Sequence, residues 1–325
     1  MYYIIVNPTS KSGLGKKIWN NLQSILDDKE ISYKVVFTKG PGHAMLCAKN
    51  LLADEEAASS DTKIKLIVLG GDGTINEVLQ GISDFDRVSI GYIPTGSSND
   101  LARALKLKKD PEFLLDTILS EKSVRKLDLG ELKYISKSDE HSRLKAAEDS
   151  NTRKFIVSCG IGFDAAVCEE SLDNTAKRIL NRLHIGKLTY LSIALKQLFA
   201  SKKIACDLYI DNSDKPIHYN KVLLLATMIQ PYEGGGFKFC PGADPSDGIL
   251  DLCVVGDVSK AKVLIALPTA FIGKHYMFKG IERYSAKNIR IKTSSPLWVH
   301  TDGEVYYKAD EIELTCSKQA VTFLV

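Results

Sequence analysis

The chain has 325 residues, of which 44% are apolar, and its 43 Lys and Arg side chains nearly balance its 40 Asp and Glu side chains, giving a net charge of +3. This length accommodates about two domains with real hydrophobic cores, which excludes a disordered chain, a collagen-like chain and a mini-protein. A nearly neutral chain also lacks the concentrated basic surface that binding to nucleic-acid phosphates requires, so we expect no nucleic-acid partner.

Short apolar runs alternate with helical patterns over about the first 120 residues, which predicts βαβ units around a mainly parallel sheet. The expected strands are residues 2–6, 32–37, 64–69 and 88–93, and the expected helices are residues 18–26, 44–52, 75–82 and 100–105. Thr74 and Glu77 have the spacing of a capping box, which places the start of the third helix there. We interpret residues 1–127 as a doubly wound, Rossmann-like nucleotide-binding domain.

Strands follow one another with little helix between them after Leu127, a pattern typical of an antiparallel β-sandwich. Helical insertions are expected within residues 173–200 and 259–272, and the polar residues 136–151 are expected to form a surface loop. The predicted fold is therefore α/β plus β: a Rossmann-like domain over residues 1–127, then a β-sandwich domain with helical insertions over residues 128–307. The C-terminal segment 308–325 is a candidate to return to the first domain.

Seven cysteines, odd in number, irregularly spaced and without a C-x-x-C pair, indicate reduced thiols of a cytoplasmic protein. The apolar runs are all shorter than a membrane-spanning helix needs, about 18 residues. The six histidines show no paired metal spacing and are interpreted as structural.

A glycine-rich segment, residues 70–74 (G-G-D-G-T), stands where the expected strand 64–69 ends and a helix begins. Glycines let the backbone turn sharply beside a ligand, and a helix N-terminus offers N–H groups and a positive dipole end to a phosphate. Asp72 would repel that phosphate unless a metal cation lies between them, which favours a Mg-nucleotide site; a capped Asp-Gly turn is the alternative. Spacing excludes other phosphate loops, because Lys17 stands where a Walker A loop needs Ser or Thr, and Asn76 where a dinucleotide loop needs Gly.

Two further polar turns follow expected strands, namely residues 7–10 (N-P-T-S) and residues 94–100 (P-T-G-S-S-N-D). The carboxyl ends of parallel strands lie at one edge of a sheet, which is where open α/β sheets bind ligands. We therefore expect the three turns to converge on one site.

Together these residues resemble the diacylglycerol kinase catalytic domain family, most closely its soluble bacterial lipid kinases, over essentially the whole chain. The resemblance rests on five short motifs in the family's order: residues 7–10, 70–78 (G-G-D-G-T-I-N-E-V), 94–103 (P-T-G-S-S-N-D-L-A-R), 234–251 and 302–304 (D-G-E). Lys11 departs from the glycine often found there, and Ser97 replaces a more usual threonine, as in sphingosine kinases. The Asn99-Asp100 pair favours diacylglycerol kinases.

The resemblance implies ATP and Mg²⁺ as cofactors and assigns roles to matching positions. Glu304 matches the proton acceptor that activates the lipid hydroxyl, Asp100 matches an acid at the interdomain cleft, and Asp72 is a candidate ligand for the Mg²⁺ of the nucleotide. Asp247 matches a ligand of a Mg²⁺ ion near the site, completed by backbone oxygens of Asp244 and Ile249. ATP-contacting positions are Asn7, Pro8, Thr9, Ser10, Thr38, Gly70, Gly71, Asp72, Gly73, Thr74, Ile75, Asn76 and Ser97.

The leading hypothesis is an ATP-dependent lipid kinase that transfers the γ-phosphate to a hydroxyl of diacylglycerol or a related lipid, giving phosphatidic acid or an analogous phospholipid. Phosphoryl transfer to an alcohol needs a positioned phosphate, a neutralising metal and a carboxylate near the hydroxyl. From the residues alone, a hairpin turn between strands 296–301 and 305–307 explains D-G-E at 302–304 better than a catalytic role, and only the family resemblance reverses this preference. A sphingosine-like or other lipid kinase, an NAD kinase and an inactive nucleotide-binding regulator remain alternatives.

The small net charge conceals an asymmetry, because residues 174–206 carry seven basic and no acidic side chains. Basic and apolar residues mixed in helices suit adsorption to an anionic membrane, and a solvated helix face is the alternative. We expect Lys177, Arg178 and Arg182 to face lipid at the inner side of the cell membrane, and exposed strands of the second domain are compatible with a homodimer. Tyr276, Phe278 and Tyr284, among Lys274, Lys279 and Arg283, form a second candidate for a membrane interface, although a partly buried helix end with solvated charges is the favoured alternative.

Overall fold

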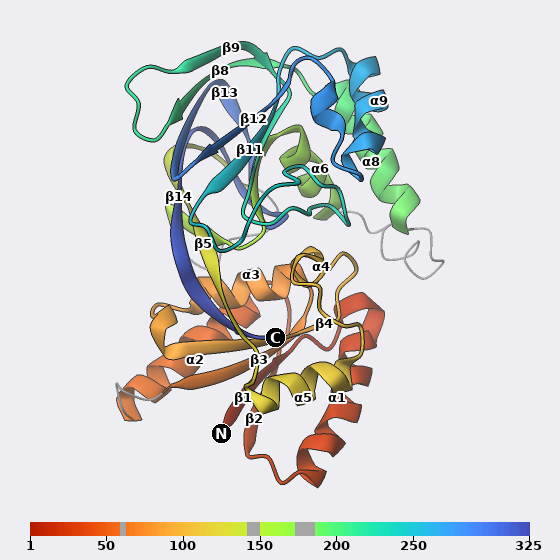
Figure 1. Cartoon of the computed structure of the whole chain (residues 1–325), viewed down its shortest axis with the longest axis vertical. Helices are drawn as coiled ribbons and strands as arrows, with labels where there is room; N and C mark the ends of the chain where they lie inside the picture. Colours follow the sequence, from red (N-terminus) through yellow and green to blue (C-terminus); the bar gives the residue numbers. More distant parts are fainter. Residues whose placement is uncertain (59–62, 142–149, 173–185) are drawn as a thin grey trace. The chain divides into compact units, whose positions relative to one another are not determined.

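The structure, a computed structural model, describes residues 1–58, 63–141, 150–172 and 186–325. It divides into two compact units, and the colours of Figure 1 follow the residue numbers from the N-terminus to the C-terminus. Unit 1 comprises residues 1–129 together with residues 318–325, and unit 2 comprises residues 130–317.

Unit 1 is built on a parallel sheet. Its strands are β1 (Tyr2–Val6), β2 (Tyr33–Phe37), β3 (Ile64–Gly70), β4 (Val88–Pro94) and the end of β14 (Glu304–Leu324). Strand β1 lies between β2 and β3, β4 pairs with β3, and residues 322–324 of β14 pair with β4, all in parallel. The apolar side chains of β3 and β4 are almost all buried, as expected of central strands that helices cover on both faces.

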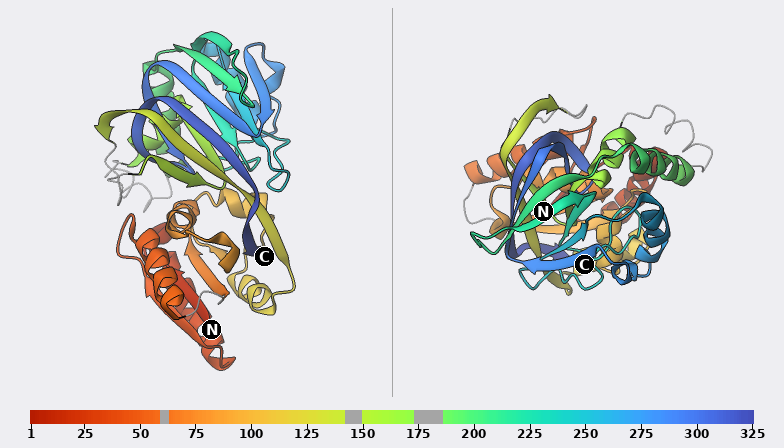
Figure 2. Two further views of the ribbon diagram at one scale, coloured as in Figure 1. Left: turned by 90° about the vertical axis from the view of Figure 1, so that its left-hand side faces the viewer. Right: turned by 90° about the horizontal axis from the view of Figure 1, so that it is seen from above.

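Helices follow the strands of unit 1 and pack against its sheet (Figure 2, left). They are α1 (Ser10–Asp28), α2 (His43–Ala58), α3 (Asp72–Gly81), the 3₁₀ turn η1 (Phe85–Arg87), α4 (Asp100–Ala104) and α5 (Pro111–Ser120). Trp19, Leu22 and Leu26 of α1 pack with Leu115 of α5 and Ile67 of β3 in one core. Three of these helices, α1, α3 and α4, begin directly after a strand of the sheet or its turn, which is the geometry that positions the site below.

Unit 2 is mainly antiparallel. It contains most of β5 (Val124–His141), all of β6 (Thr152–Phe155), β7 (Ser158–Gly162), β8 (Ile204–Ile210), β9 (Ile217–Val222), β10 (Leu224–Met228), β11 (Leu250–Val255), β12 (Ile281–Ala286) and β13 (Asn288–Thr301), and most of β14. The strand order is β12-β11-β10-β7-β13-β14, and β8 joins β13 to β9. The predicted fold, an α/β domain followed by a β-rich domain with helical insertions, is confirmed.

Helices cover one side of the unit 2 strands. They are α6 (Phe163–Leu172), α8 (Gly186–Ala200), α9 (Lys260–Ala270) and the 3₁₀ turn η2 (His275–Met277). A second core joins Val167 of α6, Ile193 and Leu198 of α8, and Val263 and Ala266 of α9. Helices α8 and α9 lie in the two expected insertions, whereas α6 was not expected.

Two local predictions are wrong. Helix α3 begins at Asp72 after an extended Gly71, so Thr74 and Glu77 lie inside the helix and do not form a capping box at its start. The Glu77 carboxylate instead accepts the N–H groups of Gly42 (2.8 Å) and Ala44 (3.0 Å) and caps the start of α2, a contact that sequence spacing does not reveal. Residues 136–141 continue strand β5 instead of forming a loop.

Candidate functional site

Three polar turns interlock at the edge of the unit 1 sheet where its strands end. The side-chain amide of Asn7, after β1, donates to the Thr74 hydroxyl at 3.0 Å. The hydroxyls of Ser10 and Thr95 lie 2.7 Å apart, and the Thr95 N–H donates to the Gly70 carbonyl at 2.8 Å. The structure therefore brings residues 7–10, 70–74 and 94–100 together.

Glycines are required where the second and third turns touch. A Cβ on Gly96 would lie 2.6 Å from the Gly71 Cα, and one on Gly70 would lie 2.4 Å from the Thr74 Cβ, both far inside van der Waals contact. Asn99, in the left-handed conformation (φ 49°), accepts the Gly96 N–H at 2.9 Å and donates to the Gly96 carbonyl at 3.0 Å. The turn before α4 is thus closed on itself and held against the turn before α3.

The start of α1 contains a run of left-handed residues. Lys11 and Ser12 have φ values of 43° and 60°, and Gly13 has φ 96°. This left-handed conformation favours glycine, which explains why the resembled family often has glycine at the position of Lys11. The Thr9 hydroxyl and N–H donate to the Asn7 side-chain oxygen at 3.0 and 3.2 Å, so residues 7–10 form a compact turn.

Asp72 and Asp100 lie close together at the starts of α3 and α4. The Asp72 carboxylate accepts the N–H groups of Asp100 (2.9 Å) and Leu101 (3.3 Å), so it caps α4. Asp100 is buried and forms an ion pair with Arg103. Burial, followed by the charges of Asp72 and Asp100, raises the pKa of the neighbouring Tyr92 well above 10. Each carboxylate oxygen has more than one lone pair, so the capping role leaves Asp72 able to ligate a cation.

The other nucleotide candidates differ in exposure. Ile75 and Asn76 are fully buried, and the Asn76 side-chain oxygen accepts from the Gln80 amide at 3.3 Å, so these two side chains belong to the core of unit 1. The Thr38 N–H donates to the Val6 carbonyl at 2.8 Å beyond the end of β2, and its side chain is half-buried. Ser97 lies in the turn that Asn99 closes.

In unit 2, the turn between β13 and β14 carries the proposed base. Asp302 and Gly303 form the turn with φ values of 51° and 86°, and Glu304 is the first residue of β14, opposite Thr301. The Asp302 carboxylate accepts the N–H groups of Ile156 (3.1 Å), Val157 (2.8 Å) and Ser158 (2.9 Å). The expected hairpin is present, and Asp302 anchors it.

A buried histidine supports the same turn. His300 is fully buried, and its Nε2 lies 3.1 Å from Glu233 Oε1 and 3.3 Å from Asp164 Oδ2. Both carboxylate oxygens face Nε2, which carries the ring proton because Nδ1 accepts an N–H from the backbone. The Gly303 N–H donates to Nδ1 at 3.2 Å. A Cβ on Gly160 would lie 2.0 Å from Asp164 Oδ2, so glycine there makes room for the group.

Sequence reasoning missed this cluster because it interpreted every histidine as structural. The only sequence signal was His300 itself, two residues before the D-G-E motif. Asp164, Glu233 and His300 are close enough to surround a metal ion. Because Nδ1 accepts an N–H, however, the proton on Nε2 faces the carboxylates, and the ring donates to them instead of ligating a cation.

The candidate magnesium loop lies between β10 and β11. Asp244 Oδ1 accepts from the N–H (3.0 Å) and hydroxyl (2.7 Å) of Ser246, and Asp247 Oδ1 accepts the Ile249 N–H at 2.9 Å. Gly248 turns the chain with φ 82°. An exposed Asp247 carboxylate and the backbone carbonyls of Asp244 and Ile249 are hard oxygen donors, so the residues present fit Mg²⁺.

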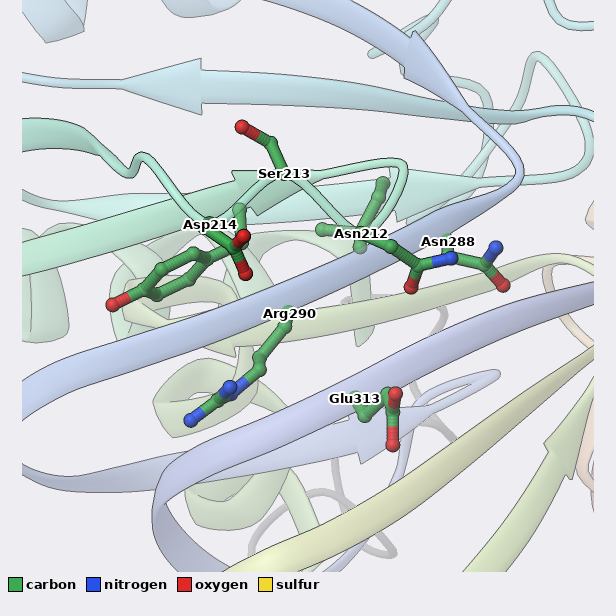
Figure 3. A pocket seen from close by; sticks show the side chains of 8 residues that line it. Asn212, Ser213, Asp214, Asn288, Arg290 and Glu313 are labelled. Atoms are coloured by element: carbon green, nitrogen blue, oxygen red, sulfur yellow. The ribbon is translucent and has the colours of Figure 1, made fainter.

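A surface pocket of about 320 Å³ lies elsewhere in unit 2, between the β8–β9 turn and strands β13 and β14 (Figure 3). Arg290 and Glu313 face each other on β13 and β14, and the Arg290 Nε donates to Glu311 at 2.7 Å. The candidate site residues do not line this pocket. The lipid-facing candidates Lys177, Arg178 and Arg182 lie outside the described residues. Within the part of the chain that the structure describes, each helix is too short or too polar to cross a bilayer.

Comparison with protein families decides between the possible phosphate-binding folds. A model of the diacylglycerol kinase catalytic domain matches residues 1–132, and a model of the YegS C-terminal NAD kinase β-sandwich-like domain matches residues 158–324. Residues 1–132 belong to the diacylglycerol kinase catalytic domain family. The first match spans all three interlocked turns, and the second spans the magnesium loop and the D-G-E turn.

Individual relatives of this family align with nearly the whole chain. YtlR of Bacillus subtilis (strain 168), named as a candidate lipid kinase, is 28% identical over 315 residues, covering 94% of this chain and 93% of its own. The diacylglycerol kinase of Bacillus subtilis (strain 168) is 27% identical over 304 residues, covering 93% and 88%. A crystal structure described as a candidate diacylglycerol kinase of Bacillus anthracis (strain Sterne) has the same fold, with a TM-score of 0.72 at 22% identity, covering 99% and 94%.

Proposed function

We propose that the chain is an ATP-dependent lipid kinase that phosphorylates a hydroxyl of diacylglycerol or a related lipid, with phosphatidic acid or an analogous phospholipid as product. The observation that carries this proposal is the pairing of three interlocked phosphate-type turns in unit 1 with an anchored D-G-E turn in unit 2, in a chain whose residues 1–132 belong to the diacylglycerol kinase catalytic domain family. Relatives that are named diacylglycerol kinase align with this chain over most of their length, which supports the choice of a lipid acceptor.

Unit 1 supplies the nucleotide site in this proposal. The turns at residues 7–10, 70–74 and 94–100 hold the phosphates of ATP, and the start of α3 presents its positive dipole end to them. Mg²⁺ bound with the nucleotide neutralises phosphate charge, and Asp72 is the side chain that would ligate it. Asp100 remains neutralised by Arg103 beside that site.

Unit 2 supplies the base. The Glu304 carboxylate accepts the proton of the lipid hydroxyl while the hydroxyl oxygen forms a bond to the γ-phosphorus and the bond to the β–γ bridging oxygen breaks, releasing ADP. Asp302 and His300 keep the turn rigid so that Glu304 does not have to be ordered during the reaction. Asp247, with the carbonyls of Asp244 and Ile249, would hold a second Mg²⁺ that stabilises the loop before β11.

An acceptor other than diacylglycerol is the second candidate. Ser97 stands where sphingosine kinases also have serine, according to the resemblance described above. The second family model is named for NAD kinase-like β-sandwiches. A regulator that binds ATP without transfer is a third candidate, against which the joint retention of Asp72, Asp100 and Glu304 argues. The proposal further includes an anionic membrane at the cytoplasmic face as partner, and a homodimer stays a prediction.

The test is a panel of acceptors with the purified full-length chain, ATP and Mg²⁺. Detergent-dispersed diacylglycerol, sphingosine and NAD are each supplied with ATP labelled at the γ-phosphate, and products are separated by thin-layer chromatography. We expect label in phosphatidic acid. Label found only in sphingosine phosphate or only in NADP would show that sphingosine or NAD, and not diacylglycerol, is the acceptor. ATP binding without transfer to any acceptor would support the candidate function of a regulator.

A further inference from the structure

Helix α9 and the residues after it expose an unusual set of large apolar side chains. Ile265 is 64% exposed, Ile272 64% and Met277 74%, while Phe271 is 48% exposed. From residue 258 to residue 281 the chain contains four lysines, Lys260, Lys262, Lys274 and Lys279, and no Asp or Glu. We call residues 260–279 the α9–η2 surface. It combines exposed apolar area with positive charge only.

Most of the exposed apolar side chains on α9 and at its C-terminal end form one stripe. Residues 261, 265 and 268, together with Ile272 just beyond the helix, follow the spacing of one helical face, and Ala261, Ile265 and Pro268 are exposed. The opposite face, with Val263, Ala266 and Ala270, is buried in unit 2. A surface helix normally carries polar residues on its outer face, so an outer face of this composition indicates a partner with an apolar interior.

The α9–η2 surface contacts residues 237–239, in the loop that begins at Glu233 next to the turn that carries Glu304. The Phe271 ring stacks on Phe237 with centroids 4.0 Å apart, and the Lys238 N–H donates to the Ala270 carbonyl at 2.9 Å. The Tyr276 hydroxyl donates to the Phe239 carbonyl at 2.7 Å. Exposed and half-buried aromatic side chains therefore continue from α9 onto residues 237–239.

The same loop begins at Glu233, which contacts His300. Glu233 and Phe237 exchange two backbone hydrogen bonds, each 2.9 Å long, and Glu233 Oε1 lies 3.1 Å from His300 Nε2. His300 in turn accepts the N–H of Gly303, next to Glu304. All of these residues belong to unit 2, so one continuous set of contacts connects the α9–η2 surface with the turn that carries Glu304.

We propose that the α9–η2 surface is the part of unit 2 that inserts into the facing leaflet of an anionic lipid bilayer. Ile265, Ile272 and Met277 insert among the acyl chains, and Lys262, Lys274 and Lys279 contact acidic headgroups, the arrangement that interfacial helices use. A bilayer suits this surface better than a protein partner because all its charges have one sign, which a layer of acidic headgroups complements. Docking would present a lipid hydroxyl near Glu304, and only this role of docking rests on the proposed function.

The test measures binding of the full chain to sedimenting vesicles of phosphatidylcholine with phosphatidylglycerol, compared with phosphatidylcholine alone. The variant Ile265→Gln with Ile272→Gln and Met277→Gln is expected to weaken binding at least about tenfold, since each substitution removes buried apolar area from the bound state. Lys262→Gln with Lys274→Gln and Lys279→Gln is expected to weaken binding to anionic vesicles and to flatten its salt dependence. ATP affinity is expected to be unchanged in both variants.

A matched control replaces three exposed apolar side chains of strands, Val124→Gln, Ile135→Gln and Ile217→Gln, at positions that are 52%, 46% and 38% exposed. This control should bind vesicles as the unaltered chain does. Equal loss in the control, or full binding by the α9 variant, would overturn the proposal. So would a chain that ignores vesicles but forms a dimer that the α9 variant dissociates, because the surface would then contact a second copy.

Failure of the proposed function is distinguishable from failure of this inference. Vesicle binding that depends on the α9–η2 surface supports docking even if no lipid is phosphorylated. Conversely, phosphorylation of a short-chain diacylglycerol dissolved as monomers needs no docking, so it tests the reaction alone. We expect the α9 variant to retain that reaction and to lose activity on vesicle-borne diacylglycerol.

Discussion

The Asp302 carboxylate accepts three backbone N–H groups from residues 156–158, a segment more than 140 residues earlier in the chain. It also occupies a left-handed conformation in the turn before Glu304. Resemblance drew attention to Glu304, whereas the structure shows that its neighbour fixes the turn. One side chain thus performs the proposed chemistry and another places it.

Replacement Asp302→Asn is expected to destabilise unit 2. Three N–H groups lose a charged acceptor, and hydrogen bonds to charged groups contribute about 1.5–3 kcal/mol to stability. The measurement is the midpoint of urea unfolding, which should fall, with Asp214→Asn in the exposed β8–β9 turn as the matched control. An unchanged midpoint for Asp302→Asn would show that these contacts do not hold the turn.

At the scale of elements, the site of unit 1 depends on how closely two strand-to-helix turns approach. Gly71 precedes α3 and Gly96 precedes α4, and neither position has room for a Cβ beside the other. Asn99 closes the second turn on itself, and the Asp72 carboxylate ties this turn to the first by accepting the Asp100 N–H. The phosphate-binding edge is therefore one interlocked layer of backbone.

Replacement Gly96→Ala is expected to separate these turns. The new Cβ would lie 2.6 Å from both the Gly71 Cα and the Asn99 Oδ1, and such overpacking costs about 1–3 kcal/mol. Calorimetric titration with Mg-ATP should show a weaker affinity. Gly40→Ala is the control, because no atom lies within 4 Å of its Cβ position and its backbone is unstrained. Equal affinities for the two variants would contradict the role of the contact.

These elements also show what a sequence can predict. The strands of unit 1 and its three turns were predictable, because apolar runs and glycine positions are local patterns and parallel strands place their ends at one edge. Contacts across long separations were not predictable: Glu77 capping α2, Asp302 binding residues 156–158, and His300 meeting Asp164 and Glu233. Such polar contacts leave no periodic signal, and only the folded chain brings them together.

At the scale of the whole molecule, residues 318–325 return to unit 1 and add a strand to its sheet. Residues 322–324 pair with β4, Val321 and Phe323 are fully buried, and the Gln319 N–H donates to Asp128 at 2.7 Å. Unit 2 is thereby inserted between two segments of unit 1 along the sequence. Charge is likewise unevenly distributed, since residues 258–281 form a second stretch, besides residues 174–206, that has basic but no acidic side chains.

The central claim joins both units in one reaction, so its most direct measurement is transfer of the labelled γ-phosphate of ATP to diacylglycerol by the unaltered chain and by Glu304→Gln. We predict phosphatidic acid from the unaltered chain and from Glu131→Gln, an exposed control. Glu304→Gln should lose about 10²–10⁴-fold in kcat, because the base is removed while the ATP site in unit 1 is untouched. Comparable turnover by Glu304→Gln, or no labelled lipid from the unaltered chain, would contradict the account.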